Sequence, residues 1–349
     1  MDALTVAQPA FRLLYEQKDV TVDLAPIILG VTYTDALAGE SDELELTIED
    51  RDGRWKNGWF PGKGDRLTLD MGYAGQELAT MGRFEIDEIE FSGPPDTVSI
   101  RALAAGVKEA LRTATTAGFE SETLRQIASG IAERNGLTLV GEGDAIDRTY
   151  ERVTQHGETD LAFLNRLGLA EGIVFAIKGG QLVWHDQGKL DAAGTILVIK
   201  RTDMLRFSFR AKTATTYKAC RVSHHHPKTK ALITHTETAE DLPSGDTLNL
   251  AERCESPEQA QAKAQAALRA ANGRQVEGSI NLYGKPRLRA GCNIEVQGLG
   301  LLDGTYQIQS ARHSIDRQQG YTTEIELATQ TAQGKTLKTK RIIALETAE

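Results

Sequence analysis

The sequence predicts a β-rich α+β protein in which two β domains flank an α+β insert. Apolar and polar residues alternate through roughly the first hundred residues, which is typical of half-buried strands. Helical spacing replaces this alternation in the middle third, and the alternation returns after residue 203. A chain of 349 residues is long enough for two or three domains. No internal repeat is strong enough to indicate a solenoid.

The first β domain is expected over residues 1–105. The segment 43–49 alternates Leu or Ile with Glu or Thr, as a half-buried strand does. In the segment 83–92 the apolar phase shifts by one residue, so we expect a β-bulge at Asp87 and Glu88. Glycine and proline turns separate the short strands, and this pattern indicates a sandwich or a barrel.

The α+β insert is expected over residues 106–202. Thr123 and Gln126 have the spacing of a capping box, which predicts that a helix begins there. A second helix is expected over 160–171 because its leucines recur at helical spacing. The stretch 173–184, with a Lys-Gly-Gly-Gln turn at its centre, is expected to form a hairpin.

The second β domain is expected over residues 203–330, with one long helix near 256–272. Ser256 has the position of an N-cap, Pro257 the position of a first helical residue, and Gln259 the position that closes a capping box. The Ala-rich segment that follows favours a helix.

The last segment, residues 331–349, is polar and basic. We expect a loose tail or a short arm that docks on a partner. Its basic residues are Lys335, Lys338, Lys340 and Arg341.

Composition excludes several classes of protein. The 40 Lys and Arg against 49 Asp and Glu give a net charge of −9, which argues against broad binding to phosphate groups. The 26% of charged and 40% of hydrophobic residues exclude wholesale disorder. The three cysteines form no CxxC pair, so we expect neither a disulfide framework nor a zinc ribbon. There is no signal-peptide pattern and no long apolar run, so no membrane insertion is expected.

Motifs for catalysis or metal binding are weak. His224, His225 and His226 are adjacent, but consecutive residues of a strand point to opposite faces, and no nearby ligand completes a site. The sequence contains no Gly-x-Ser-x-Gly elbow and no phosphate-binding glycine loop that opens a helix. We therefore expect no enzyme, no catalytic residue, no metal and no cofactor.

Acidic residues cluster between positions 35 and 52. A solvated strand face explains most of them, and the alternative is the wall of a channel, where like charge would repel a passing polyanion. The candidate channel-lining residues are Glu43, Glu45 and Glu49. The cluster consists of Asp35, Glu40, Asp42, Glu43, Glu45, Glu49, Asp50 and Asp52, with Arg51 as the one basic residue among them.

Aromatic residues are concentrated just after this cluster. Trp55, Trp59 and Phe60 lie in a loop rich in Gly, Lys and Asp. Such a loop either packs over its own domain or anchors a partner, because Trp and Arg dominate interface energetics. Together with Arg51 these residues are the candidate subunit or partner interface.

Five stretches of the sequence together resemble the phage late-control gene D family, whose members are baseplate hub proteins of contractile tails. The resemblance covers roughly residues 5–330 in the expected order. The stretches are LELTIEDRDGRWKNGWFPGKGDRLTLDMGY, GRFEIDEIEFSGPPDTVSIRALA, TLRQIASGIAERNGLTLVGE, ETDLAFLNRLGLAEGIVFAIKGGQLVW and LRAGCNIEVQGLGLLDGTYQIQSARHSIDRQQGYTTEIEL.

The resemblance implies a structural hub whose two β domains are tube-like barrels. Three chains would then form a ring of six barrels, which joins a six-fold tail tube to a three-fold spike and lines the central channel. It implies a homotrimer that contacts the tail tube protein, the spike protein and other baseplate proteins, while genome DNA passes without sequence-specific binding. The expected location is the tail baseplate of a virion or a pyocin-like contractile injection system, assembled in the bacterial host cytoplasm. The hub part of type VI secretion spike proteins is similar.

Besides a structural hub, the residue types raise two other functions. A carbohydrate-binding or carbohydrate-cleaving tail module is the alternative, since it would use the carboxylates and exposed tryptophans. No appended peptidoglycan-cleaving domain is recognisable in this sequence. A transcription factor is disfavoured because the acidic chain has no basic helix-turn-helix.

Overall fold

The computed structural model describes most of the chain, with short gaps. The described residues are 7–38, 41–106, 113–212, 217–225, 230–239 and 245–329. The expected basic tail, residues 331–349, lies outside them, as do Glu40 and His226. Within these stretches no helix has the length and apolar character needed to cross a membrane.

The N-terminal half of the main sheet is antiparallel, and its strands lie in the order β3-β4-β7-β6-β5-β1-β2. The bulge expected near residues 87 and 88 is confirmed, because the pairing of β6 with β7 shifts register between Ile86 and Glu88. The elements are β1 (Pro9–Tyr15), β2 (Lys18–Asp19), α1 (Thr21–Leu24), β3 (Ile28–Ala36), β4 (Glu43–Glu49), β5 (Arg66–Tyr73), β6 (Ala79–Ser92) and β7 (Thr97–Ala104).

Alternation along these strands builds the first core. Leu44, Leu46 and Ile48 of β4 are almost fully buried, while the Glu and Thr residues between them stay half-buried on the other face. Each such side chain contributes about 1.5–3 kcal/mol when it leaves water. Tyr321, from the far end of the chain, packs into the same core.

The C-terminal half of the main sheet has a core of its own, which includes Ile280, Val296 and Ile308. β14 pairs with β18, and β18 with β21. β13 lies inside the range expected for the insert, yet it pairs with β19. The strands are β13 (Thr195–Lys200), β14 (Met204–Ala211), β18 (Val276–Tyr283), β19 (Asn293–Gln297), β20 (Gly304–Asp316) and β21 (Gly320–Thr329); η2 (Arg201–Asp203) and η3 (Gly300–Leu302) are short 3₁₀ turns.

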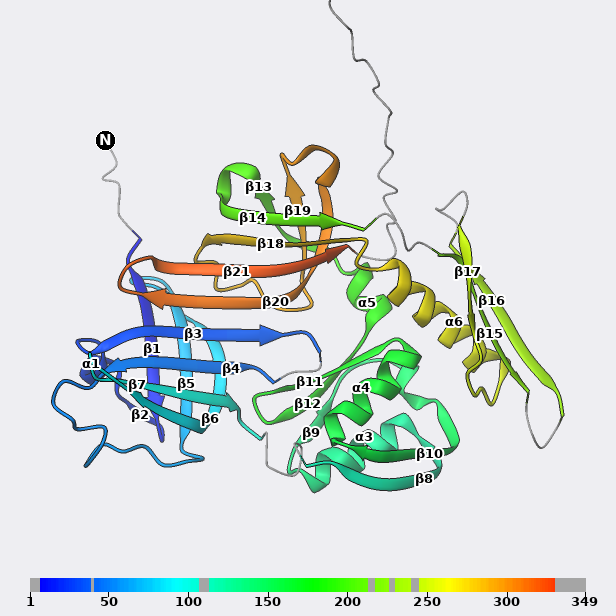
Figure 1. Ribbon diagram of the computed structural model, residues 1–349, viewed down its shortest axis with the longest axis horizontal. Helices are drawn as coiled ribbons and strands as arrows, with labels where there is room; N and C mark the ends of the chain where they lie inside the picture. Colours follow the sequence, from blue (N-terminus) through cyan, green and yellow to red (C-terminus); the bar gives the residue numbers. More distant parts are fainter. Residues whose placement is uncertain are drawn as a thin grey trace, which may run out of the picture.

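The two halves form one sheet, because β20 pairs with β3 over seven residue pairs, from Ser310 opposite Ala36 to Asp316 opposite Gly30. The result is a 13-stranded sheet (Figure 1). Among the described residues no strand pairing closes either half into a barrel. The β-rich α+β architecture is therefore present, whereas the expected pair of barrels is not confirmed.

The middle of the chain forms a separate α+β unit beside the sheet (Figure 1). The capping box of Thr123 and Gln126 is present at the start of α3, and the expected hairpin is β11–β12. Gly172 ends α4 with a left-handed backbone, as a glycine after a helix commonly does. The elements are β8 (Thr115–Thr123), α3 (Leu124–Arg134), β9 (Thr138–Val140), η1 (Ala145–Asp147), β10 (Thr149–Glu158), α4 (Asp160–Glu171), β11 (Ile173–Lys178), β12 (Gln181–Asp186) and α5 (Gln187–Ala192).

A second small unit lies between β14 and β18 in sequence, inside the range expected for the second β domain. Its three strands pair in the order β16-β15-β17 and pack against α6. Ser256 caps α6 as expected, but Gln259 accepts a hydrogen bond from the backbone of Glu255 instead of closing a capping box. The elements are β15 (Tyr217–His225), β16 (Leu232–Thr238), β17 (Asp246–Leu250) and α6 (Pro257–Asn272).

Candidate functional site

One face of the main sheet carries a polar row that crosses both halves. Residues directly opposite each other on neighbouring strands share a face of the sheet. Glu324 of β21 lies opposite Arg312 of β20, and Arg312 lies opposite Thr34 of β3. Thr34 in turn lies opposite Glu43 of β4. The row therefore runs without interruption through the β3–β20 pairing.

A parallel row extends this face through β7 to β6. Glu45 lies opposite Arg101, and Arg101 lies opposite Glu88. We call this surface the acidic sheet face. Its charged residues on β21, β20, β4, β7 and residues 85–92 of β6 are Glu43, Glu45, Glu49, Glu85, Glu88, Glu90, Arg101, Arg312, Asp316, Glu324 and Glu326.

The candidate channel residues Glu43, Glu45 and Glu49 thus lie together on the acidic sheet face. Glu43 accepts a hydrogen bond from Arg101 at 2.6 Å, and Glu49 accepts one from Arg51 at 2.6 Å. These pairs neutralise part of the local charge, and the same side of the sheet continues past the named strands with Arg66, Arg83, Arg206 and Arg210. Acidic residues still outnumber basic ones on the acidic sheet face itself.

The aromatic loop divides into a buried and an exposed part. Trp55 is 9% exposed and belongs to the first core. Trp59 and Phe60 are 44% and 58% exposed. Trp59 meets Trp55 edge-to-face at 5.9 Å between ring centroids, and Phe60 stacks on Phe91 at 5.8 Å. One tryptophan therefore anchors the loop to its own sheet, and two aromatic rings remain accessible.

A second exposed apolar surface was not predicted. Ile196 and Val198 of β13, with Leu205 and Phe207 of β14, are 37–50% exposed. We call these four residues the edge patch, because β13 and β14 each pair with one strand in the described sheet. The signal was the sequence TILVIK, which is apolar at successive positions and so places apolar side chains on both faces of β13.

A buried ion cluster joins three parts of the chain. Lys178, at the end of β11, pairs with Asp35 of β3 and with Asp42, which precedes β4. Asp42 also accepts a hydrogen bond from the Tyr33 hydroxyl at 2.9 Å. Asp35 accepts one from the backbone N–H of Ala290 at 2.9 Å. The insert, the first half and the second half of the sheet therefore meet at this junction cluster.

Burial controls the ionisation of the junction cluster. Burial raises the pKa of Asp42 to about 6, although Lys178 opposes the shift. For Lys178 itself burial favours the neutral form, but Asp42 and Asp35 outweigh it and raise the pKa of this amine above its usual value. The lysine therefore carries its charge in the folded protein, which compensates the buried carboxylates.

His313 lies in the same region, fully buried on β20. Its Nε2 donates to the Leu288 carbonyl at 2.9 Å, which leaves Nδ1 to accept from the Tyr321 hydroxyl at 3.1 Å. The ring stacks on Tyr33 at 6.0 Å between centroids. Burial, with a smaller contribution from Arg289, lowers the pKa of His313 to about 4.

The residues singled out for metal binding do not gather into a site. His224 and His225 end β15, while His226 is outside the described residues. Across the described stretches, no group of three or more His, Cys, Asp or Glu residues is arranged to hold a metal ion.

Sequence comparisons find one family and two phage relatives. A family model described as phage tail baseplate hub (GPD) matches residues 96–319. A protein of Escherichia phage 186 is 32% identical over 188 residues, which are 54% of this chain and 48% of the relative. A protein of Escherichia phage P2 is 29% identical over 231 residues, which are 65% of this chain and 59% of the relative. Both carry the name "Probable baseplate hub protein", a structural role and not an enzymatic one. The chain matches about half of each relative.

Solved structures share the fold at low sequence identity. A 43 kDa tail protein of prophage MuSo2 from Shewanella oneidensis has a TM-score of 0.68 and 17% identity, covering 93% of this chain and 98% of its own. A tail protein from Neisseria meningitidis MC58 has a TM-score of 0.66 and 13% identity, covering 92% and 97%. A type VI secretion component of E. coli has a TM-score of 0.55 and 15% identity, covering 86% and 73%.

The variant Lys178→Met tests the junction cluster. It leaves two buried carboxylates without their cation, so the free energy of unfolding should fall by about 3 kcal/mol in chemical denaturation. Adding Asp42→Asn to this variant should recover part of the loss. The exposed Lys63→Met is the control and should change stability by less than about 0.5 kcal/mol. An unchanged midpoint for Lys178→Met would show that the cluster does not hold the three parts together.

The variant His313→Gln tests the buried imidazole. The unfolded chain protonates this histidine near pH 6.5, whereas the folded chain does so near pH 4. The histidine therefore supports folding fully above pH 6.5, and this support is lost as the pH falls towards 4. Relative to His313→Gln, the protein should lose about 3 kcal/mol of unfolding free energy between pH 7 and pH 4. Contributions of Asp42 are common to both proteins and cancel. A constant difference across this range would contradict the assignment.

Proposed function

Since this chain belongs to the phage tail baseplate hub (GPD) family, we propose that three copies form a ring that joins a six-fold tail tube to a three-fold spike. A baseplate hub is a component of the phage tail, so the family places the chain in the virion tail. Trimer formation, lining of the channel and contact with tube and spike are the parts that we propose. Assembly would take place in the cytoplasm of the bacterial host.

Two units per chain would solve the mismatch of symmetry. The two halves of the sheet have separate cores and are joined edge to edge by β3 and β20. If each half occupies one of six equivalent positions, three chains complete the ring. We propose the domain division 1–105, 106–202 and 203–330, with β13 assigned to the last domain because it pairs with β19.

The acidic sheet face is the observation that best supports a channel. Because it continues across the β3–β20 pairing, three chains could present it as an unbroken wall. Carboxylates on such a wall would repel DNA phosphates and so keep the genome from adhering during passage. Glu43, Glu45 and Glu49 are the residues that we assign to the channel.

Exposed apolar surfaces are candidates for subunit and partner contacts. The edge patch offers Ile196, Val198, Leu205 and Phe207 on strands with an open edge. Trp59 and Phe60, in the loop that follows Arg51, offer a second surface on the first half, where Arg54 lies over the Trp59 ring. Surfaces of this kind are costly in water and favour burial against another protein.

The carbohydrate-cleaving alternative gains no support from the site. Glu43 and Glu49 are held by Arg101 and Arg51, whereas a two-carboxylate mechanism needs an acid and a base that flank a substrate.

The ring is tested by cryo-electron microscopy of the particle that contains this chain. We expect three copies at one level, each contributing both halves of its sheet, with the edge patch or Trp59 and Phe60 covered by a neighbour. Six separate copies at one level would refute the proposal.

Charge reversal tests the channel assignment. Replacing Glu43, Glu45 and Glu49 by Lys in an infectious particle should slow genome ejection, because cations on the wall would attract the DNA backbone. The control is Glu133→Lys, an exposed change on α3 of the insert. Normal assembly with unchanged ejection kinetics would remove these residues from the channel, while leaving the ring itself open to the imaging test.

A further inference from the structure

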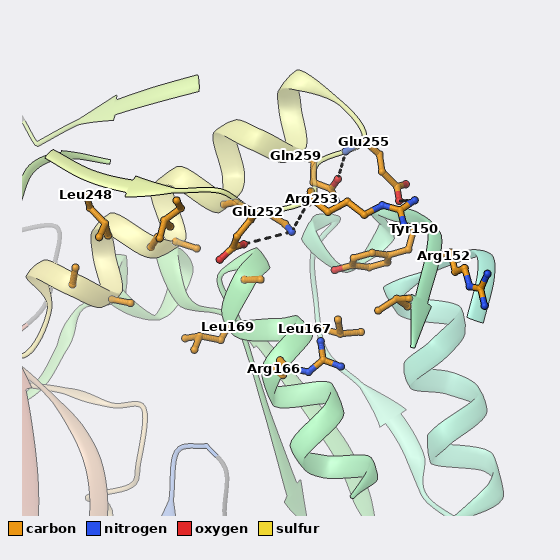
Figure 2. A pocket seen from close by; sticks show the side chains of 18 residues that line it. Tyr150, Arg152, Arg166, Leu167, Leu169, Leu248, Glu252, Arg253, Glu255 and Gln259 are labelled. Carbon is orange, nitrogen blue, oxygen red and sulfur yellow. Dashed lines mark hydrogen bonds and ion pairs between the residues drawn. The ribbon is translucent and has the colours of Figure 1, made fainter. Parts of the chain in front are cut away.

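An apolar groove lies between the insert and the small unit that contains α6. Its volume is about 770 Å³, and α4, α6, β10 and β17 form its walls. Figure 2 shows Leu167 and Leu169 of α4 on one wall and Leu248 of β17 on another. Leu169 is 64% exposed, so the groove presents apolar surface that no described part of the chain covers.

Small residues on α6 keep the groove open. Ala266, Ala267, Ala270 and Ala271 line it, where longer side chains would fill the space against α4. Apolar residues make up most of the lining, but charged residues of both signs lie among them: Arg166 beside Leu167, and Glu252 and Arg253 between Leu248 and Tyr150 (Figure 2). A surface of leucine and alanine interspersed with charges of both signs suits a short amphipathic peptide segment.

A second hollow continues the groove. It has a volume of about 380 Å³ and shares Leu169, Ala266 and Ala270 with the first. It extends past the end of α6 to Arg274 and to Thr329. Together the two hollows follow α6 from its C-terminal end to its first turn, a distance of about 24 Å for a helix of this length.

The described chain ends at the entrance of this path. Thr329 is the last described residue, lies in the wall of the second hollow, and accepts a hydrogen bond from the backbone of Val276 at 3.3 Å. The sequence continues through residues 330–349. Residues 330–341 could span about 40 Å when extended, which exceeds the length of α6.

We propose that the segment 330–349 docks in this groove on its own chain. Its apolar residues, Ile342, Ile343 and Leu345, would cover the exposed Leu169 and the half-buried leucines of β17. Glu346 follows directly and would lie near Arg152, whose guanidinium also has Glu120 at 3.7 Å. The basic residues before Ile342 would remain near the entrance, in contact with water.

Tethering makes this docking favourable even if the contact is weak. Because residues 330–349 are joined covalently to Thr329 in the wall of the second hollow, their effective concentration at the groove is on the order of 1 mM. With an intrinsic Kd of about 100 µM, the groove would be occupied about 90% of the time. The proposed docking involves one chain only and does not depend on the ring.

A disulfide-trapping experiment on the full chain tests the proposal. The double variant Leu169→Cys with Ile343→Cys is oxidised mildly, and the new disulfide is located by peptide mass mapping. Of the native cysteines, Cys220 and Cys254 are buried and Cys292 is partly buried, and a disulfide to any of them is identified by the same mapping. The matched control is Val22→Cys with Ile343→Cys, since Val22 is 84% exposed and lies on α1, at the other end of the molecule (Figure 1).

We expect the Leu169 variant to form a disulfide within one chain, and the Val22 control to form little. Adding Ile342→Asp and Leu345→Asp should abolish the trapping, because the new carboxylates would not enter an apolar groove. A disulfide between two chains would overturn the proposal in favour of a second copy as the occupant. Equal yields for the two cysteine pairs, or no disulfide in either, would show that the segment does not dock.

Discussion

The pairing of β20 with β3 is the contact on which the rest of the structure depends. It joins residues nearly three hundred positions apart in the sequence and connects two groups of paired strands into one sheet. On the buried side of this pairing His313 and Tyr33 stack on each other, and their polar atoms form hydrogen bonds within the protein. A neutral, hydrogen-bonded imidazole is inexpensive to bury, whereas a charged one is not. The backbone hydrogen bonds between β3 and β20, the packing of these rings and the hydrogen bonds of their polar atoms therefore hold the two halves together.

The insert is attached by different chemistry. Lys178 reaches from the hairpin to Asp35 and Asp42, and Ile177 forms a backbone bridge with Ser41, so a charged network and one bridge, and not a shared apolar core, fix the hairpin to the sheet. Buried ion pairs add less stability than apolar packing, but they tolerate few alternative geometries. We infer that this junction fixes the orientation of the insert, which matters for a protein whose neighbours in an assembly must align with it.

Local patterns predicted the local structure. The alternation of apolar and polar residues predicted β4, the shift in its phase predicted the bulge at Asp87, and the capping residues predicted where α3 and α6 begin. The pairings of β13 with β19 and of β3 with β20 were not predicted, because no local signal encodes contacts between distant strands. For the same reason Glu43 and Glu45 were recognised as a cluster, but their alignment with the acidic residues of β21 became visible only through the register.

The small unit that carries α6 leaves and re-enters the sheet at one place. β14 ends and β18 begins on adjacent strands, with Ala211 opposite Val276, and the backbone N–H of Lys212 donates to the carbonyl of Gln275 at 2.7 Å. The unit is therefore an insertion between β14 and β18, which would otherwise form a simple hairpin. Its outward surface can diversify without disturbing the backbone pairing of the sheet, whereas its inner side is tied to the insert, because Gln259 donates to Glu171 at 3.3 Å and Glu255 accepts from the backbone of Glu151 at 2.6 Å.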